Sequence, residues 1–312
     1  MSVTVQRGLP AIAELADEGI TVNVRNRNEK NDNAVRIAVL NLMPLKQQTE
    51  SDIIRALSSS PVSIDIEWIQ PATHRSKNTD AAHLDKFYST FSDRPVTDFD
   101  GIIITGAPIE RIPFESVDYW PELCNIMDSI KVAQIPTMML CWGAFAGLYY
   151  RYGIPKYVIP DKISGVFPHR LLLPDHPAVA GCEPSFSVPH SRFTEVRRTD
   201  VERVKDVVIL AESPESGLYL MCSADGRELY VTGHSEYTAL TLDSEYRRDM
   251  SRNMNPSIPA HYYPCDNPDL TPVIIWEQHR KCLFSNWSEL CRNYRQQKQT
   301  PAKDYHSPEV EQ

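Results

Sequence analysis

The residue best suited to covalent chemistry is a cysteine between two apolar segments. Residues 136–141 form an apolar run that predicts a buried strand, and residues 142–150 continue with the spacing of an apolar helix. Cys141 therefore lies where a strand turns sharply into a helix, which is the layout of a nucleophile elbow. Such a turn raises the thiol above the sheet edge, and the positive end of the helix favours a thiolate. The backbone N–H of Trp142 would form one half of an oxyanion hole.

A second group of candidate residues follows a later predicted strand. Residues 228–232 predict that strand, and His234 and Glu236 come directly after it. His234 would act as the general base, while Glu236 would hold its imidazole in the right tautomer. Taken alone, Cys141 also fits a small buried apolar residue, and His234 also fits a histidine in a surface loop. The presence of both motifs in one chain favours catalysis.

Strands and helices alternate through the first 150 residues. The pattern predicts strands at 35–43, 63–69, 99–105 and 136–141, and helices at 49–57, 117–131 and 142–150. Further strands are expected at 207–211, 218–223 and 228–232, followed by a helix at 237–253. This alternation is typical of the α/β class, with a doubly wound, mostly parallel sheet whose functional site lies at the carboxyl ends of the strands.

The composition excludes several classes of protein. The chain has 312 residues, of which 42% are hydrophobic and 23% are charged, as in ordinary globular proteins. With 32 basic and 41 acidic residues its net charge is −9, which argues against nucleic-acid binding. Seven cysteines without a C-x-x-C pair argue against a disulfide framework and against a zinc ribbon. The sequence contains no metal-binding motif and no Gly-rich phosphate loop.

One uncharged stretch of nineteen residues, 132–150, approaches the length of a membrane span. Its proline and its central glycine favour a buried strand followed by a buried helix, so we expect no membrane association. The N-terminus lacks the apolar core of a signal peptide, and a cytoplasmic location is expected. We expect a polar N-terminal arm at 1–33, a single α/β domain at 34–292 and a polar C-terminal tail at 293–312.

An ordered series of motifs between residues 34 and 290 resembles the homoserine O-acyltransferases of methionine biosynthesis, which comprise O-acetyltransferases and O-succinyltransferases. The series includes Asn41-Leu-Met-Pro44, Thr105-Gly-Ala-Pro108, Cys141-Trp-Gly-Ala144, Pro189-His-Ser-Arg192, Thr232-Gly-His234, Glu245-Tyr-Arg-Arg-Asp249 and Leu283-Phe-Ser-Asn-Trp287. The resemblance implies an acyltransferase. The chain order Cys, His, Glu on an alternating α/β pattern is that of class I glutamine-amidotransferase-like enzymes, with a flavodoxin-like sheet.

The resemblance implies a ping-pong reaction with a covalent intermediate. Cys141 would attack the acyl-CoA carbonyl, release CoA and carry the acyl group as a thioester. His234 would take the thiol proton and then the hydroxyl proton of L-homoserine, and Glu236 would orient His234. The family's substrate-binding positions correspond to Lys162, Ser191 and Arg248, while His190 and Arg192 are further pocket candidates. Cationic side chains at such positions suit the anionic groups of homoserine and CoA.

Three features refine this interpretation. Ser235 replaces the proline of the family's His-Pro-Glu motif, which loosens the loop that presents Glu236. Glu110 stands where members that resemble the succinyl enzymes carry glycine, and its charge would repel the carboxylate of a succinyl group. We therefore expect acetyl-CoA as the acyl donor. The backbone at Ala107 is the candidate for the second half of the oxyanion hole.

The expected partners are the small molecules L-homoserine and acetyl-CoA, with acetyl-CoA as a substrate rather than a cofactor. No organic cofactor, metal, nucleic acid or membrane is expected, and a homodimer is left open. Three alternatives remain at this stage: a homoserine O-succinyltransferase that uses succinyl-CoA, a glutamine-amidotransferase-like hydrolase, and a non-catalytic α/β binding module with an inactive triad. The glutaminase alternative calls for a domain or partner that consumes ammonia, and the sequence shows no such domain.

Overall fold

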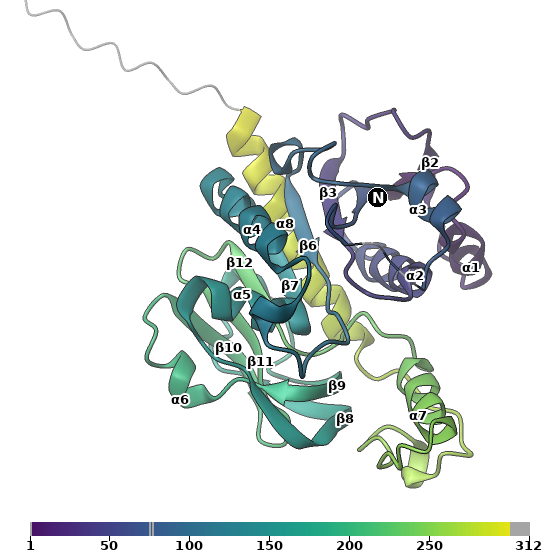
Figure 1. Ribbon diagram of the computed structural model, residues 1–312, viewed down its shortest axis with the longest axis vertical. Coiled ribbons are helices and arrows are strands. Elements are labelled where there is room, and N and C mark those ends of the chain that lie inside the picture. Colours follow the sequence, from purple (N-terminus) through teal and green to yellow (C-terminus); the bar gives the residue numbers. More distant parts are fainter. Residues whose placement is uncertain (1, 75, 77, 300–312) are drawn as a thin grey trace, which may run out of the picture.

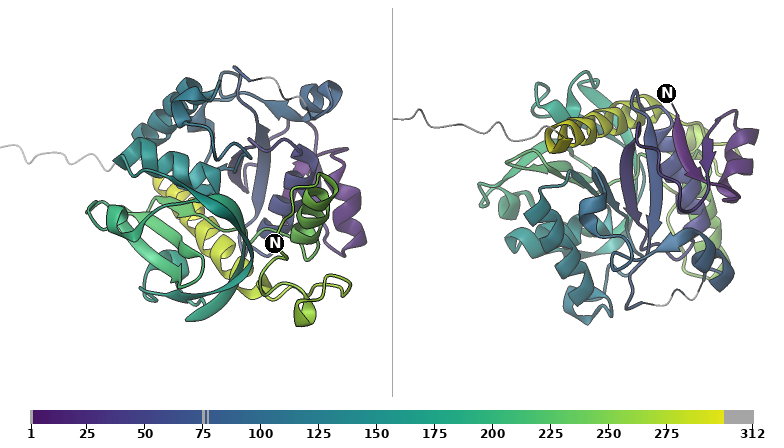
Figure 2. Two further views of the ribbon diagram at one scale, coloured as in Figure 1. Left: turned by 60° about the horizontal axis from the view of Figure 1, so that its bottom comes forward. Right: turned by 90° about the horizontal axis from the view of Figure 1, so that it is seen from above.

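The computed structural model describes residues 2–74, 76 and 78–299. Within this part of the chain, one sheet runs through the molecule in the order β2-β1-β4-β3-β6-β7-β12-β11-β10-β8-β9, and β5 pairs with β4. The strands from β2 to β12 in this order are parallel, and those from β12 to β9 are antiparallel. Helices cover both faces of the parallel part (Figures 1 and 2).

The parallel part contains the strands that the alternation in the sequence predicts. It comprises β1 (Val3–Gln6), β2 (Asn23–Arg25), β3 (Val35–Leu40), β4 (Ile64–Ile69), β5 (Tyr88–Ser89), β6 (Gly101–Ile104), β7 (Thr137–Leu140) and β12 (Glu228–Val231). Every residue of β6, β7 and β12 is buried. Strands that are covered on both faces favour apolar residues at successive positions, which explains the uninterrupted apolar runs in the sequence.

The helices around the parallel strands form two layers. They are α1 (Ala11–Asp17), α2 (Lys46–Leu57), α3 (Ala81–Phe87), α4 (Trp120–Ala133), α5 (Trp142–Tyr152) and α8 (Glu277–Gln299). Ile37 and Val39 of β3 pack in one hydrophobic cluster with α1, α2 and α8, whereas Ala38 and Leu40 pack in a second cluster with α4 and α5. Successive side chains of a strand point to opposite faces, so this division confirms the doubly wound arrangement.

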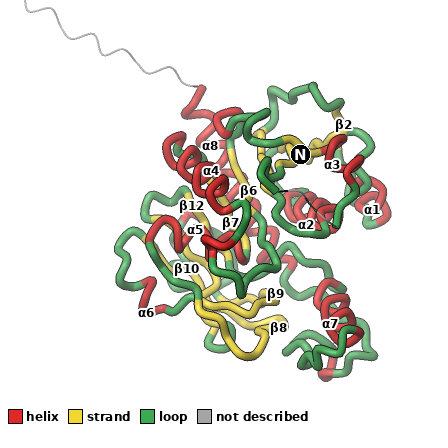
Figure 3. The backbone as a smooth tube through the Cα atoms, in the orientation of Figure 1, coloured by secondary structure: helices red, strands yellow, loops and turns green. Residues whose placement is uncertain are grey.

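The antiparallel part extends the sheet on the side of β12. It comprises β8 (Tyr157–Leu171), β9 (Ser185–Glu195), β10 (Val207–Ser213) and β11 (Gly217–Ser223). The remaining elements are α6 (Arg198–Val201), α7 (Thr241–Ser251) and the 3-10 turns η1 (Val96–Asp98), η2 (Phe114–Ser116), η3 (Pro177–Val179) and η4 (Pro264–Asp266). Figure 3 shows α7 between long loops beside the hairpin of β8 and β9. A small cluster anchors it there, in which Val166 of β8 packs with Tyr237, Leu242 and Trp276.

The N-terminal segment differs from the irregular arm that the sequence predicts. β1 lies between β2 and β4, with Val3 opposite Ile64. Leu15 of α1 is fully buried in the cluster that covers one face of the sheet. β1 is only four residues long, so its apolar alternation is too brief to stand out in a polar region. At the other end of the chain, α8 continues to Gln299, while residues 300–312 of the expected tail lie outside the described part.

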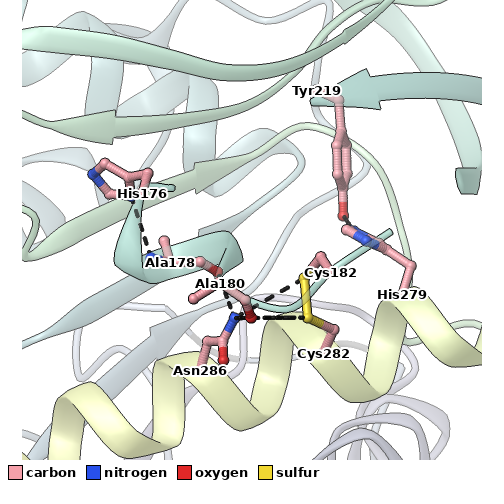
Figure 4. Close-up of a disulfide and its surroundings, with 8 residues drawn as sticks. All are labelled: His176, Ala178, Ala180, Cys182, Tyr219, His279, Cys282 and Asn286. Carbon is pink, nitrogen blue, oxygen red and sulfur yellow. Dashed lines mark hydrogen bonds between the residues drawn. A yellow bond between two sulfur atoms is a disulfide. The ribbon is translucent and has the colours of Figure 1, made fainter. Parts of the chain in front are cut away.

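The structure also contains a disulfide, which the sequence analysis did not predict, since it argued against a disulfide framework. Cys182 and Cys282 are 100 residues apart in sequence, and their sulfurs are bonded (Figure 4). The bond links the segment between η3 and β9 to α8. Asn286 of α8 supports the same contact, because its Nδ2 donates to the carbonyls of Ala178 at 3.3 Å and Ala180 at 3.0 Å. Sequence spacing cannot reveal such a pair, because only the packing of α8 brings the two cysteines together.

Among the described residues, no helix combines the length and the apolar character that crossing a membrane requires. The uncharged stretch at 132–150 forms the end of α4, β7 and most of α5, as the sequence analysis expects.

Candidate active site

Cys141 occupies a strained turn between β7 and α5. Its backbone has φ 48° and ψ −114°, a combination that non-glycine residues rarely adopt and that often marks a functional site. The helix that follows packs closely against the end of β6, because a Cβ added at Gly143 would lie 2.8 Å from the carbonyl oxygen of Thr105. The glycine therefore allows the turn to be tight. The structure confirms the elbow geometry that the apolar strand and helix predict.

His234 and Glu236 reach the same edge of the sheet from β12. β12 pairs with β7 so that Val231 lies opposite Leu140, which places the carboxyl ends of the two strands side by side. His234 Nδ1 lies 2.7 Å from Glu236 Oε1, and both side chains are buried. The backbone N–H of His234 donates to the carbonyl of Pro189 at 2.8 Å, which fixes the loop.

The imidazole of His234 also lies near enough to the Cys141 side chain for the two groups to interact electrostatically. Burial alone would lower the pKa of His234, but the charges of Cys141 and Glu236 raise it well above its usual value. The arrangement therefore favours a protonated His234 imidazole, which the Glu236 carboxylate holds in place near the Cys141 thiol. In general, a cationic imidazole beside a cysteine promotes the thiolate, which is the nucleophilic form.

The candidate oxyanion donors lie next to the thiol. Trp142 is the first residue of α5, and the N–H groups of a first helical turn have no acceptor within the helix. The loop after β6 passes close to Cys141, since a Cβ added at Gly106 would lie 3.2 Å from the Cys141 Cβ. Ala107 follows in that loop and is buried. The loop that carries Ala107 thus approaches the turn at Cys141 and Trp142, and the oxyanion role of the two backbone N–H groups is still a prediction.

Glu110 lies directly beside the nucleophile. Its Oε1 is 4.0 Å from the Cys141 sulfur, and its Oε2 accepts a hydrogen bond from the backbone N–H of Phe193 at 2.9 Å. Burial raises the pKa of Glu110, and the Phe193 N–H opposes that shift. An acyl group on Cys141 would therefore extend into space that the Glu110 carboxyl restricts. The structure thus puts this residue where it can act on the acyl group.

Two of the three predicted substrate-binding residues meet at one carboxylate. Lys162 Nζ lies 3.2 Å from Glu245 Oε2, and the hydroxyl of Ser191 donates to the same oxygen. Lys162 also lies 3.3 Å from Asp249 Oδ2. We call Lys162, Ser191 and Glu245 the acceptor cluster. Arg248 is linked to this cluster through Asp249, because its Nε donates to Asp249 Oδ1 at 2.9 Å, and its side chain is 45% exposed.

Glu245 is a candidate that the sequence reasoning missed. It lies on α7, and Asp249 lies four residues further on, so both carboxylates share one face of the helix. The four-residue spacing of Glu245 and Asp249, within a motif that supports the family resemblance, could have pointed to this residue. A cavity of about 170 Å³ adjoins this face, and its lining includes Lys162, Ser164, Phe193, Tyr246, Asp249 and Met254.

The other pocket candidates, His190 and Arg192, have structural partners instead. His190 is fully buried, and its Nε2 lies 3.1 Å from His169 Nε2. Arg192 is 2% exposed and donates to the backbone carbonyls of Thr194 and Ser216. Both side chains of β9 are thus held in the interior by hydrogen bonds to other parts of the protein. Among the described residues, no group of three or more His, Cys, Asp or Glu side chains is arranged to hold a metal ion.

Comparisons with known proteins agree with this geometry. A family model described as homoserine O-succinyltransferase matches residues 2–301. A protein of Desulfitobacterium hafniense named homoserine O-acetyltransferase is 48% identical over 96% of this chain and 97% of its own length. Proteins of the same name from Bacteroides fragilis and Thermotoga petrophila are 46% and 45% identical over 92% and 93% of this chain, and over 94% and 96% of their own lengths.

Solved structures confirm the fold class. A GMP synthase component of Thermoplasma acidophilum matches with a TM-score of 0.55 at 14% identity, over 86% of this chain and all of its own. A glutamine amidotransferase of Thermotoga maritima matches with a TM-score of 0.52 at 12% identity, over 85% of this chain and 97% of its own. The architecture is therefore that of class I glutamine amidotransferases. With a family model that matches nearly the whole chain and relatives that are 45–48% identical, the protein belongs to the homoserine O-succinyltransferase family.

Proposed function

We propose that this protein transfers the acetyl group of acetyl-CoA to the hydroxyl of L-homoserine, giving O-acetyl-L-homoserine and CoA. The observation that carries the proposal is the buried His234–Glu236 pair, 2.7 Å apart and near Cys141, with Glu110 4.0 Å from the sulfur. Relatives that are 45–48% identical over more than nine-tenths of the chain are named homoserine O-acetyltransferase. The names of these relatives and the arrangement of the site in this protein both favour this reaction.

The first half of the reaction acylates the enzyme. The Cys141 thiolate attacks the acetyl-CoA carbonyl, and the carbonyl oxygen gains negative charge that the N–H groups of Trp142 and Ala107 stabilise. As the tetrahedral intermediate collapses, the bond to the CoA sulfur breaks and His234 supplies the proton that leaves with CoA. Exchange of one thioester for another costs little free energy, so this half reaction is reversible.

The second half delivers the acetyl group to homoserine. His234, now neutral, removes the proton of the homoserine hydroxyl while its oxygen attacks the thioester carbonyl, and Cys141 leaves as a thiolate. Glu236 stabilises the imidazolium that forms. The acceptor cluster supplies the carboxylate of Glu245 and the ammonium of Lys162 for the amino and carboxylate groups of homoserine.

Glu110 favours acetyl over succinyl as the transferred group. A succinyl chain would bring its own carboxylate toward the Glu110 carboxyl in a poorly solvated pocket, and like charges there cost several kcal/mol by a rough Coulomb estimate. An acetyl group has no charge and is shorter. The family model's description as a succinyltransferase thus names the family, while Glu110 sets the donor of this chain.

Mass spectrometry combined with steady-state kinetics tests the proposal. Incubation with acetyl-CoA should add one acetyl group to Cys141, and Cys141→Ala should abolish that mass gain while Cys265→Ser, which changes an exposed free cysteine, should keep it. Turnover with acetyl-CoA should exceed turnover with succinyl-CoA, and Glu110→Gly should shift the preference toward succinyl-CoA. Faster turnover with succinyl-CoA in the wild type would refute the donor assignment, and release of ammonia from glutamine would favour the hydrolase alternative.

We also propose a cytoplasmic location, because a catalytic thiolate fits a reducing compartment. The Cys182–Cys282 disulfide points the other way, since such bonds are uncommon in reducing surroundings. Rapid alkylation of the protein in intact cells, followed by peptide mass mapping, shows whether Cys182 and Cys282 are free thiols or are bonded to each other. A homodimer is still a prediction. Sedimentation equilibrium tests it by measuring the molecular mass of the protein in solution.

A further inference from the structure

Tyr237 joins the catalytic imidazole to the acceptor cluster. Its ring stacks on the ring of His234, with centroids 4.2 Å apart and planes inclined by 17°. Its hydroxyl donates a hydrogen bond to Glu245 Oε1 at 3.0 Å. The other oxygen of Glu245 accepts from Lys162 and Ser191, so one buried side chain contacts both halves of the site.

The surroundings of Tyr237 hold this side chain in place. Its backbone N–H donates to the His234 carbonyl at 3.2 Å, and its own carbonyl accepts from the indole N–H of Trp276 at 3.1 Å. The residue is 7% exposed and packs against Val166 and Leu242. Burial and the neighbouring carboxylates raise the pKa of the Tyr237 phenol well above 10, so the hydroxyl remains a neutral donor.

We propose that Tyr237 is a positioning residue with two separable tasks: its ring aligns His234 for both half reactions, and its hydroxyl orients Glu245 for the acceptor half. This inference rests on the proposed function and deepens it, because it concerns the site that homoserine would enter. Glu245 has a choice of partners in the acceptor cluster, and the fixed phenol limits its carboxylate to one orientation. The acceptor hydroxyl is thereby held toward His234.

Ping-pong kinetics separate the two tasks. In such a reaction kcat/KM for acetyl-CoA reports on acylation alone, and kcat/KM for homoserine reports on the second half alone. Tyr237→Phe keeps the stacked ring and removes the hydroxyl, so kcat/KM for homoserine should fall about tenfold, the effect of losing one hydrogen bond to a charged group. Its kcat/KM for acetyl-CoA should stay within about twofold of the wild type.

Tyr237→Leu removes the ring as well. Both kcat/KM values should then fall by about tenfold or more, because His234 loses the stacking that aligns it. The pH profile of kcat/KM for acetyl-CoA should also shift, since it reports the ionisation of His234 and Cys141 in the free enzyme. A purely structural role would lower the amount of folded protein without moving that profile. A higher kcat/KM for acetyl-CoA in Tyr237→Phe than in Tyr237→Leu would show that the aromatic ring supports the acylation step.

Tyr263→Phe is the matched control. It also removes a buried phenol hydroxyl near α7, one that donates to Asp243 at 2.6 Å, and it should leave both kcat/KM values unchanged. The inference is overturned if Tyr237→Phe matches the wild type in both half reactions, or if it lowers both equally. Wild-type protein that leaves Cys141 unacetylated or homoserine unmodified would contradict the proposed function and the inference together. Active wild-type protein with an unaffected Tyr237→Phe variant contradicts the inference alone.

Discussion

Two buried histidine sites lie next to each other in this molecule and carry opposite preferences for charge. His234, beside Cys141 and Glu236, has a pKa raised well above its usual value. Behind it, burial lowers the pKa of His169 to about 4, that of His279 to about 3 and that of His190 well below 6.5. The two sites are in contact at Gly233, where an added Cβ would come within 2.9 Å of His190 Nε2.

The partners of each ring, rather than its burial, account for this difference. His234 faces a carboxylate and a thiol that can both be anionic. The other histidines face neutral groups or a cation: His169 bonds Ser216, His279 bonds the hydroxyl of Tyr219, and His190 lies near Arg192. Histidines that are all buried therefore favour a charged ring at the catalytic site and neutral rings at the other.

The largest expected effect comes from removing the carboxylate that distinguishes the catalytic site. Glu236→Gln should reduce kcat/KM by about 10⁴-fold, as loss of the orienting carboxylate does in other His-dependent triads. The pKa of His234 should fall, because one of the charges that raise it is gone. Steady-state kinetics over pH measure both changes. In a Cys141→Ala background the same substitution should have no further effect, and an added loss there would show that Glu236 acts elsewhere.

Removing the disulfide should destabilise the region that contains the neutral histidines, and it should leave catalysis by His234 unchanged. The bond closes a loop of 100 residues and ties α8, which carries His279, to the segment before β9. Cys282→Ser should lower the free energy of unfolding by roughly 3–5 kcal/mol, measured by denaturant titration. Activity at 25 °C should stay within about twofold. Cys265→Ser, at an exposed free cysteine, serves as the control and should change neither quantity. A large loss of activity in Cys282→Ser would mean that the two sites are coupled.

The pH dependence of stability should reveal the neutral histidines. The pKa of His169 is about 4 in the folded protein and about 6.5 when unfolded, so the unfolded state takes up its proton first as the pH falls. The stability that His169 contributes is present above pH 6.5 and is lost between pH 6.5 and 4, up to about 3 kcal/mol. His169→Gln should flatten the measured profile across this window. An unchanged slope would place the acid sensitivity in other groups.

The smallest effect is expected at an exposed histidine–carboxylate pair. His74 Nδ1 lies 2.6 Å from Asp118 Oδ2, almost the distance between His234 and Glu236, but the two side chains are 35% and 61% exposed. Asp118→Asn should change the free energy of unfolding by less than about 1 kcal/mol, because solvent screens the pair. Activity should be unchanged. A loss as large as that of Glu236→Gln would mean that burial is not what gives the catalytic pair its strength.

The parts that the sequence predicts correctly are those whose signal is local. The elbow at Cys141 follows from an apolar strand, a small residue and an apolar helix in immediate succession. The strands β3, β6 and β7 appear as apolar runs because they are covered on both faces. β1 and the long hairpin of β8 and β9 give weaker signals, since their pairing depends on partners far away in the chain.

The sequence by itself therefore determined the α/β class, the strand-to-helix turn at Cys141, and the order in which nucleophile, base and carboxylate follow one another. Only the tertiary structure decided that Glu245 joins Lys162 to Ser191, that Tyr237 touches both His234 and Glu245, and that Cys182 meets Cys282. The physical reason is that burial periodicity and turn geometry act between neighbouring residues. Hydrogen bonds and disulfides between distant segments depend on strand order and helix packing, which no local pattern records.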